Sequence, residues 1–178
     1  MTKVPHNPNE IIAVVNDKNN VIGKATRVEA HKKGLLHREV YVYFINSKKQ
    51  ILLQKRKDNG LWDHSSAGHF PYNQEYIEAA QREFEEELGI ILDKSEFQEL
   101  TDEKLKTEKK NGINYRFAKI FLVKKDFDIG DFNVDHEEIE KVKFFDKKEL
   151  QEILNAPEKV MTGSSKNIIM NYFLKELD

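Results

Sequence analysis

Residues 75–88 read EYIEAAQREFEEEL, and this stretch decides how the chain is expected to fold and where its chemistry lies. Its apolar residues recur at three- and four-residue spacing, which predicts an amphipathic helix. They form one stripe: Ile77, Ala80, Phe84 and Leu88. Asn73 is a candidate N-cap, and Gly89 suits the left-handed position just past the end. The helix therefore has signals for its start, its buried face and its stop.

Three glutamates lie close together on this predicted helix. Glu83 and Glu87 are four residues apart and Glu86 is three beyond Glu83, so their side chains share one surface. Adjacent carboxylates repel one another, and a hard divalent cation, which prefers oxygen ligands, would offset that repulsion. Mg²⁺ or Mn²⁺ bound there could neutralise a substrate phosphate and lower the pKa of an attacking water. Standing alone, three glutamates in so charged a chain more often form a solvated acidic face.

A longer pattern surrounds the glutamates. Gly68 followed by residues 82–90, REFEEELGI, resembles the Nudix box, G-x5-E-x7-R-E-U-x-E-E-x-G-U, in which U is apolar. The resemblance implies an α/β fold, the Nudix-type α/β/α sandwich, with a mixed β-sheet and the box as loop–helix–loop. One position departs, because the first glutamate of the box falls on Gln74. We interpret Gln74 as a neutral hydrogen-bonding substitute that holds Arg82.

The resemblance implies Mg²⁺-dependent or Mn²⁺-dependent hydrolysis of a diphosphate linkage, in a nucleoside diphosphate linked to another moiety. It assigns the metal to Glu83, Glu86 and Glu87, helped by the backbone carbonyl of Gly68. Arg82 would orient these carboxylates through charge-assisted hydrogen bonds. The general base stays open between Glu86 within the box and two residues of a later acidic loop, Glu137 and Glu138.

Three further residues are candidates for substrate binding: Arg56, His69 and Glu138. Arg56 ends a predicted strand near the box, and it is equally suited to a phosphate contact or a surface ion pair. His69 could line the pocket, as could His31 and His37, but a hydrogen-bonded structural histidine is just as typical for each. The sequence leaves both interpretations open.

The resemblance extends across roughly residues 10–155. The stretches 22–27 (IGKATR), 52–56 (LLQKR) and 61–63 (LWD) resemble a Nudix branch that is related to the type I isopentenyl-diphosphate isomerases and includes many hydrolases. The isomerases carry a cysteine before the Gly-His pair and two glutamates on the strand after the box. Those positions are Ala67, Asn114 and Arg116 here.

Isomerisation needs proton delivery and removal at opposite faces of an alkene. The loss of both the cysteine and the glutamates therefore argues against it. Another alternative is a non-catalytic nucleotide-binding Nudix module. Its expected mark is the decay of the metal ligands, and all three are intact. A metal-dependent hydrolase is therefore the favoured interpretation.

The composition bounds the class of protein. A chain of 178 residues suits a single domain, 1–178, with a flexible segment at 1–9 and a C-terminal helix within 158–178 that packs on the domain. The 29 basic and 31 acidic residues nearly balance, which argues against general nucleic-acid binding. The absence of cysteine and of long apolar runs predicts a cytoplasmic protein without a membrane segment. The expected partner is a small nucleotide or diphosphate, and the sequence is compatible with a homodimer.

The rest of the chain alternates between strand and helix patterns, which predicts a mixed sheet with helices on its faces. The predicted strands are 11–15, 21–27, 40–45, 51–56, 115–123 and 140–145, and further helices are predicted at 147–154 and 165–177. Residues 27–36 are polar and predict a connector, and 97–105 is open between strand and helix. Residues 111–112, Asn-Gly, predict a hairpin turn.

Overall fold

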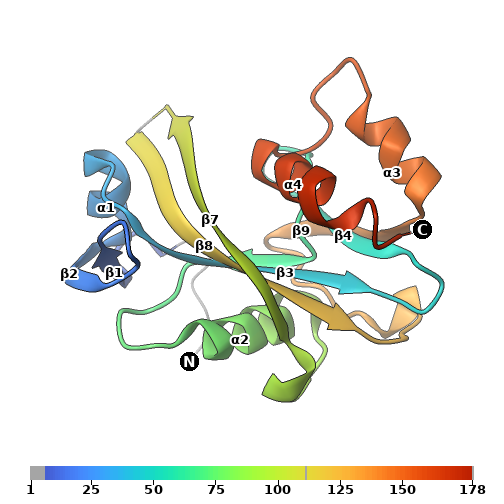
Figure 1. Cartoon of the computed structure of the whole chain (residues 1–178), viewed down its shortest axis with the longest axis horizontal. Helices are drawn as coiled ribbons and strands as arrows, with labels where there is room; N and C mark the ends of the chain where they lie inside the picture. Colours follow the sequence, from blue (N-terminus) through green and yellow to red (C-terminus); the bar gives the residue numbers. More distant parts are fainter. Residues whose placement is uncertain (1–6, 111, 178) are drawn as a thin grey trace.

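A nine-stranded mixed sheet lies between helices in the computed structural model, which describes residues 7–110 and 112–177 (Figure 1). The strands are β1 (Ile11–Val15), β2 (Val21–Thr26), β3 (His37–Ile45), β4 (Ile51–Arg56), β5 (Trp62–Asp63), β6 (Ser66–Gly68), β7 (Gln98–Lys109), β8 (Gly112–Lys124) and β9 (Ile139–Phe145). The helices are α1 (Arg27–Lys33), α2 (Tyr76–Leu88), α3 (Lys147–Leu154) and α4 (Gly163–Ile168), and α4 continues into the π-helical turn η3 (Ile169–Phe173). Two short turns complete the set, η1 (Lys94–Glu96) and η2 (Ile129–Asp131).

Strand β3 is the centre of the sheet. The main path runs β2-β1-β3-β4-β5, while β6 and β8 also pair with β3, β7 pairs with β8, and β9 pairs with β4. The β3–β8 pair is parallel and all the others are antiparallel. A central strand covered on both faces needs apolar residues throughout, which explains the unbroken run VYVYFI at 40–45.

The two faces of β3 bury two separate cores because successive side chains of a strand point to opposite faces. Val40, Val42 and Phe44 pack with α2, whose buried face includes Phe84 and Leu88. The intervening residues Tyr41, Tyr43 and Ile45 pack with the C-terminal helices. Figure 1 shows α2 on one side of the sheet and α3 and α4 on the other. The α/β sandwich expected from the sequence is confirmed.

Helix α2 begins at a different residue from the one predicted. It starts at Tyr76, and its N-cap is Glu75, which forms a reciprocal capping box with Glu78. The prediction of Asn73 as the N-cap is therefore wrong, because the capping box satisfies the first backbone donors two residues later. Gly89 ends the helix at φ 71°, as its position in the sequence predicts.

Residues 27–36 were expected to connect two strands, and that prediction is wrong. Residues Arg27–Lys33 form helix α1, capped by the Thr26 hydroxyl, which accepts from the Glu29 amide at 3.2 Å. The helix ends at Gly34 with φ 63°. Ala30 is its one buried residue, so α1 lacks the apolar stripe by which a helix is recognised in a sequence.

The later elements resolve the remaining predictions. Residues 97–105, which could form either strand or helix, belong largely to strand β7. Asn111 of the predicted hairpin turn lies outside the described residues, as does 1–6 of the segment expected to be flexible, while Lys109 pairs with Gly112. The single C-terminal helix predicted at 165–177 is instead α4 followed by η3. Within the described residues, none of the helices is long and apolar enough to span a membrane.

Candidate active site

Glu83 is buried at the point where α2 meets β6. Its Oε1 accepts a hydrogen bond from Arg82 Nη2 at 2.6 Å. Gly68 leaves the space that the carboxylate occupies, because a Cβ at this glycine would lie 2.5 Å from Glu83 Oε1. The glycine of the predicted box is therefore required by the close approach of a carboxylate, and its backbone lies beside the candidate metal ligand.

Glu87 lies one turn further along α2 and is also buried. Its Oε2 accepts from the Ala67 backbone amide at 3.0 Å and from Gln54 Nε2 at 3.4 Å. These two hydrogen bonds hold the Glu87 carboxylate against β6, beside Gly68. The i, i+4 spacing seen in the sequence thus places the side chains of Glu83 and Glu87 against the same short strand, β6.

Arg82 links the remaining parts of the box. Its Nη1 donates to Glu86 Oε2 at 2.8 Å, its Nε to Gln74 Oε1 at 3.3 Å, and its Nη2 reaches the His69 carbonyl at 3.4 Å. Burial alone would lower the pKa of Arg82, but Glu83 and Glu86 raise it above its usual value. The contact of Gln74 with Arg82 agrees with the interpretation of Gln74 as a neutral hydrogen-bonding substitute.

We name Glu83, Glu86 and Glu87 the carboxylate cluster. Two of the three are buried against β6 and the third is half-buried, so their charges are partly shielded from water. Arg82 forms ion pairs with two of them, with Glu83 at 2.6 Å and with Glu86 at 2.8 Å. Clustered carboxylate oxygens suit Mg²⁺ or Mn²⁺, and a backbone carbonyl is a ligand of the same hard type. The donor set therefore fits a hard divalent cation.

The later acidic loop is attached to the C-terminal end of α2. The amides of Asn133 and Asp135 donate to the carbonyls of Leu88 and Glu87, each at 3.0 Å. Glu137 and Glu138, the other candidate bases, follow directly in the same loop. The structure thus brings the loop to the end of the box helix, although 133–138 lies about 50 residues away along the sequence.

All three predicted substrate-binding residues have protein partners in the structure. Arg56 pairs with Asp58 at 2.7 Å and with the buried Asp63 at 3.3 Å. The His69 side chain is buried, and its backbone carbonyl accepts a hydrogen bond from Arg82 Nη2 at 3.4 Å. Glu138 is half-buried, and its carbonyl accepts from the Lys57 amide at 2.9 Å.

The three histidines that could line the pocket form a second group of titratable side chains. His69 Nε2 lies 3.1 Å from His31 Nε2 and 3.0 Å from His37 Nε2, and we name these residues the histidine cluster. They come from α1, the start of β3 and the residue after β6. No local spacing connects them, so the distances between their rings follow from the folded sheet and not from a motif.

The isomerase positions lie next to this cluster. Arg116 and Asn114 are buried on β8, whose parallel register places Arg116 opposite His37. Arg116 Nε pairs with Glu39 Oε2 at 2.7 Å and contacts the Tyr41 hydroxyl. Burial would raise the pKa of Glu39, but His69 and Arg116 lower it overall, so this carboxyl is charged. An ion pair between Arg116 and Glu39 therefore lies at a position where the sequence resemblance implies an isomerase glutamate.

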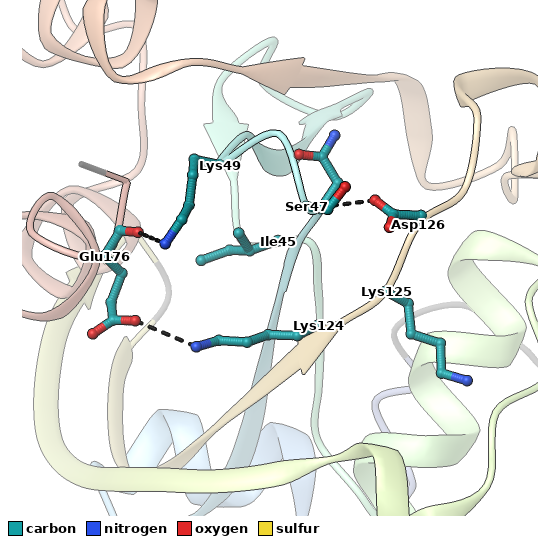
Figure 2. Close-up of a pocket in the computed structure, with 8 residues that line it drawn as sticks. Ile45, Ser47, Lys49, Lys124, Lys125, Asp126 and Glu176 are labelled. Atoms are coloured by element: carbon teal, nitrogen blue, oxygen red, sulfur yellow. Dashed lines mark hydrogen bonds and ion pairs between the residues drawn. The ribbon is translucent and has the colours of Figure 1, made fainter.

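A hollow of about 220 Å³ lies away from both clusters, beside the ends of β3 and β8 (Figure 2). It is lined by Ile45, Asn46, Ser47, Lys49, Lys124, Lys125, Asp126 and Glu176. Its charges are paired across the opening, with Lys124 Nζ 3.4 Å from Glu176 Oε2 and the Ser47 amide 2.8 Å from Asp126 Oδ1. Among the described residues, none of the predicted site residues lines this hollow.

Comparison with known proteins identifies the family. The NUDIX domain model matches residues 35–163. A Nudix hydrolase of Listeria monocytogenes is 30% identical over 151 residues, covering 82% of this chain and 85% of the relative. Nudix hydrolase 3 of Arabidopsis thaliana is 34% identical over 139 residues, covering 72% of this chain and 18% of the relative. An isopentenyl-diphosphate Delta-isomerase of Serratia proteamaculans is 34% identical over 86 residues, covering 46% of this chain and 48% of the isomerase.

Solved structures show the same fold. A protein of Deinococcus radiodurans superposes with a TM-score of 0.67 at 17% identity, covering 92% of this chain and 99% of that one. The Ap4A hydrolase of Caenorhabditis elegans gives a TM-score of 0.53 at 17% identity, covering 79% and 98%. The chain belongs to the Nudix family. It spans less than half the length of the Arabidopsis and Serratia relatives.

Proposed function

We propose that this protein hydrolyses a diphosphate linkage in a nucleoside diphosphate linked to another moiety, with Mg²⁺ or Mn²⁺ as its cofactor. The observation that carries the proposal is the convergence of the carboxylate cluster on Gly68, with Arg82 bonded to two of its members. Membership of the Nudix family and the hydrolase names of relatives support the reaction class. The Ap4A hydrolase among the structural neighbours supports a nucleotide substrate, although that likeness is one of fold.

Glu83, Glu86 and Glu87 would hold the metal, with the Gly68 carbonyl as a further ligand. The bound ion would offset the charge of the diphosphate and lower the pKa of the attacking water. Arg82 holds Glu83 and Glu86 in position through hydrogen bonds of 2.6 and 2.8 Å, which spares the site from reorganising during reaction. Gln54 and the Ala67 amide do the same for Glu87.

The reaction is the attack of a water oxygen on one phosphorus of the linkage. The new P–O bond forms as the P–O bond to the bridging oxygen breaks, and the second phosphoryl group leaves with that oxygen. A carboxylate accepts the proton that the water loses. Glu86 is suited to this role because it is the half-buried member of the cluster, and Glu137 or Glu138 could reach the same place from the acidic loop. Arg56, His69 and Glu138 are the proposed substrate contacts.

The experiment is a panel of nucleoside diphosphate sugars, dinucleoside polyphosphates, coenzymes and nucleoside triphosphates, assayed for metal-dependent release of phosphorylated products. We expect at least one substrate to be cleaved with Mg²⁺ or Mn²⁺, and cleavage to stop when a chelator is added. The Glu83→Gln variant serves as the matched inactive protein. Turnover that is unchanged by the chelator or by this variant would contradict the proposed site.

The isomerase relatives make a second activity worth testing on the same preparation. Ala67, Asn114 and the ion-paired Arg116 stand where an isomerase has its cysteine and glutamates. We expect the protein not to interconvert isopentenyl and dimethylallyl diphosphates with Mg²⁺, Mn²⁺ or Zn²⁺. Product analysis measures this, with a known isomerase as the positive control. Interconversion that the Arg116→Gln variant abolishes would show that the alternative is correct.

We propose that the protein acts in the cytoplasm and that its partner is a small nucleotide or diphosphate. We expect it to bind neither a membrane nor nucleic acid in general. The nearly balanced charge supports the last point. A homodimer is compatible with the proposal, and light scattering at two protein concentrations measures it directly.

A further inference from the structure

The sheet divides beside the candidate active site. Strands β3 and β4 form two residue pairs, Phe44 with Leu52 and Ile45 with Ile51. Further along, β3 pairs with β6 and β4 pairs with β5, so each strand has a new neighbour. Residues 64–65 join β5 to β6 and cross from one arm of the division to the other. We name this division the fork.

Ser65 lies at the point where the fork begins. Its hydroxyl accepts a hydrogen bond from the Phe44 amide at 2.9 Å and donates one to the Leu52 carbonyl at 2.5 Å. Two residues away, the Asn46 amide donates directly to the Gln50 carbonyl at 3.1 Å. Bonded pairs alternate along an antiparallel ladder, so a regular ladder would also bond Phe44 directly to Leu52. The Ser65 hydroxyl occupies the place of that bond.

The hydroxyl keeps the fork open at a fixed width. Ser65 is 0% exposed, so the two backbone groups that it bridges lie in the core. Without the hydroxyl, the amide and the carbonyl either stay unsatisfied, which is costly, or bond to each other. The second outcome brings β3 and β4 together and closes the fork. The crossing segment would then have to move, and with it the start of β6.

Both hydrogen-bond donors to Glu87 come from the arms of the fork. The Ala67 amide and Gln54 Nε2 donate to Glu87 Oε2 at 3.0 and 3.4 Å. Ala67 follows Ser65 by two residues, and Gln54 follows Leu52 by two residues. One donor therefore lies on β6 and the other on β4. The separation of the two donors depends on the bond that joins Ser65 to Leu52.

We propose that Ser65 is a positioning residue of the metal site, because its hydroxyl sets the separation of the two donors that orient the Glu87 carboxylate. The inference rests on the proposed function, in which Glu87 is a metal ligand. Hydrogen bonds outside the ligand set orient the ligands and change metal affinity without touching the ion. Serine suits the position because its hydroxyl both donates and accepts a hydrogen bond and occupies little volume.

Ser66 provides a matched control in the same segment. Both serines are 0% exposed. The Ser66 Oγ, however, makes no hydrogen bond to any described part of the chain. Changing either serine to alanine removes one buried oxygen atom, but only the change at Ser65 breaks the bridge across the fork. A difference between the two variants therefore reports the bridge and not the loss of a hydroxyl in general.

The first test is Mn²⁺ binding to the whole chain, followed by the electron paramagnetic resonance signal of the free ion. Ser65→Ala should weaken binding by about 10-fold, because the donors to Glu87 are displaced. Ser66→Ala should bind as the unaltered protein does. Equal Mn²⁺ affinity in the two variants would overturn the proposal. An unaltered protein that binds no Mn²⁺ would contradict the proposed function itself, and the role of Ser65 with it.

Activity on the identified substrate gives a second readout. Ser65→Ala should raise the half-saturating Mg²⁺ concentration by about 10-fold while the KM for the substrate stays within a few-fold. A role confined to stability would lower the rate by the same factor at every Mg²⁺ concentration. An unchanged Mg²⁺ dependence in folded Ser65→Ala would therefore overturn the proposal.

A double variant tests whether Ser65 acts through Glu87. In the Glu87→Gln protein the carboxylate that the fork orients is absent. Adding Ser65→Ala to this protein should change the remaining Mn²⁺ affinity by less than about twofold. A further loss of about 10-fold in the double variant would show that Ser65 acts by another route.

A measurement on the unaltered protein covers the case in which Ser65→Ala fails to fold. Amide ¹H–¹⁵N spectra recorded during a Mg²⁺ titration report the surroundings of each backbone N–H. We expect the resonances of Ala67 and Phe44 to shift together, because Ser65 links the two segments. The Asn155 amide, bonded to the Gln151 carbonyl in α3, should not shift. An Ala67 resonance that shifts while that of Phe44 stays in place would overturn the proposal.

Discussion

The carboxylate cluster and the histidine cluster lie on either side of the same short strand, β6, yet they are built in opposite ways. The carboxylate cluster comes from a single helix, at spacings of three and four residues. The histidine cluster comes from three elements that only the folded sheet brings together. One cluster is charged and compensated by an arginine, whereas the buried rings of the other are neutral. The spacing along one helix therefore predicts that the three glutamates lie together, whereas no local spacing predicts how the three histidines are arranged.

Removing one charge from the carboxylate cluster should have the largest effect. Glu87→Gln or Glu86→Gln keeps the shape and helix propensity of the side chain, but either loses a metal ligand. We expect turnover to fall by at least about 100-fold, as it does when a key electrostatic group is lost. Steady-state rates on the identified substrate measure this.

Exposed Glu85 on the same helix is the matched control, since Glu85→Gln removes the same charge from α2 away from the cluster. Its rate should stay within a few-fold of normal. Equal losses in Glu85→Gln and Glu87→Gln would mean that the net charge of the helix matters and the cluster does not.

Filling the space at Gly68 should have the next largest effect. The Cβ introduced by Gly68→Ala would overlap the Glu83 carboxylate, so either the helix or the strand must shift. We expect a loss of about 1–3 kcal/mol in the free energy of unfolding, together with weaker Mg²⁺ activation. Gly130→Ala, where a Cβ meets no atom within 4 Å, is the control. Chemical denaturation of the three proteins decides whether the close approach is real.

The buried imidazole of His64, which lies outside the histidine cluster, tests how burial affects a histidine in this fold. Burial lowers the pKa of His64, whose Nδ1 lies 2.6 Å from the Tyr43 hydroxyl. Above the usual histidine pKa of about 6.5 the ring is neutral whether the chain is folded or unfolded. As the pH falls below that value the unfolded chain takes up the proton first, so stability should fall by up to about 1.4 kcal/mol per pH unit.

Denaturation at pH 7.5 and pH 5.5 measures this slope, and His64→Gln should reduce it. An identical pH dependence in both proteins would show that His64 is not responsible.

Restoring the first glutamate of the box should have the smallest effect. Gln74 Oε1 accepts from Arg82 Nε at 3.3 Å, so Gln74→Glu adds a charge to an existing contact. We expect activity within a few-fold and a gain of at most about 1 kcal/mol, because the site is half-buried. Activity is titrated against Mg²⁺ for both proteins. A shift of about tenfold or more in the half-saturating concentration would mean that position 74 contributes to the metal site.

The parts of the molecule that the sequence predicts are those specified by local patterns. Helix α2, its Gly89 terminus and the sandwich fold follow from periodicity and from the box. Helix α1 escaped prediction because it buries only Ala30, so its helical character rests on the Thr26 cap. The Arg116–Glu39 pair depends on the parallel pairing of β3 with β8, which joins residues nearly 80 positions apart. The meeting of His37 with His69 depends on the antiparallel pairing of β3 with β6.

The alternation of side chains along β3 also means that the two layers of the protein can be altered independently. Val40, Val42 and Phe44 belong to the layer that supports the box helix, and Tyr41, Tyr43 and Ile45 to the layer beneath the C-terminal helices. Substitutions in one set can change the packing of one layer while the other layer keeps its packing. A one-residue insertion in this strand, by contrast, would exchange the two sets and disrupt both layers together. Substitutions can therefore change either face of β3 separately, whereas a change in the length of β3 affects both faces.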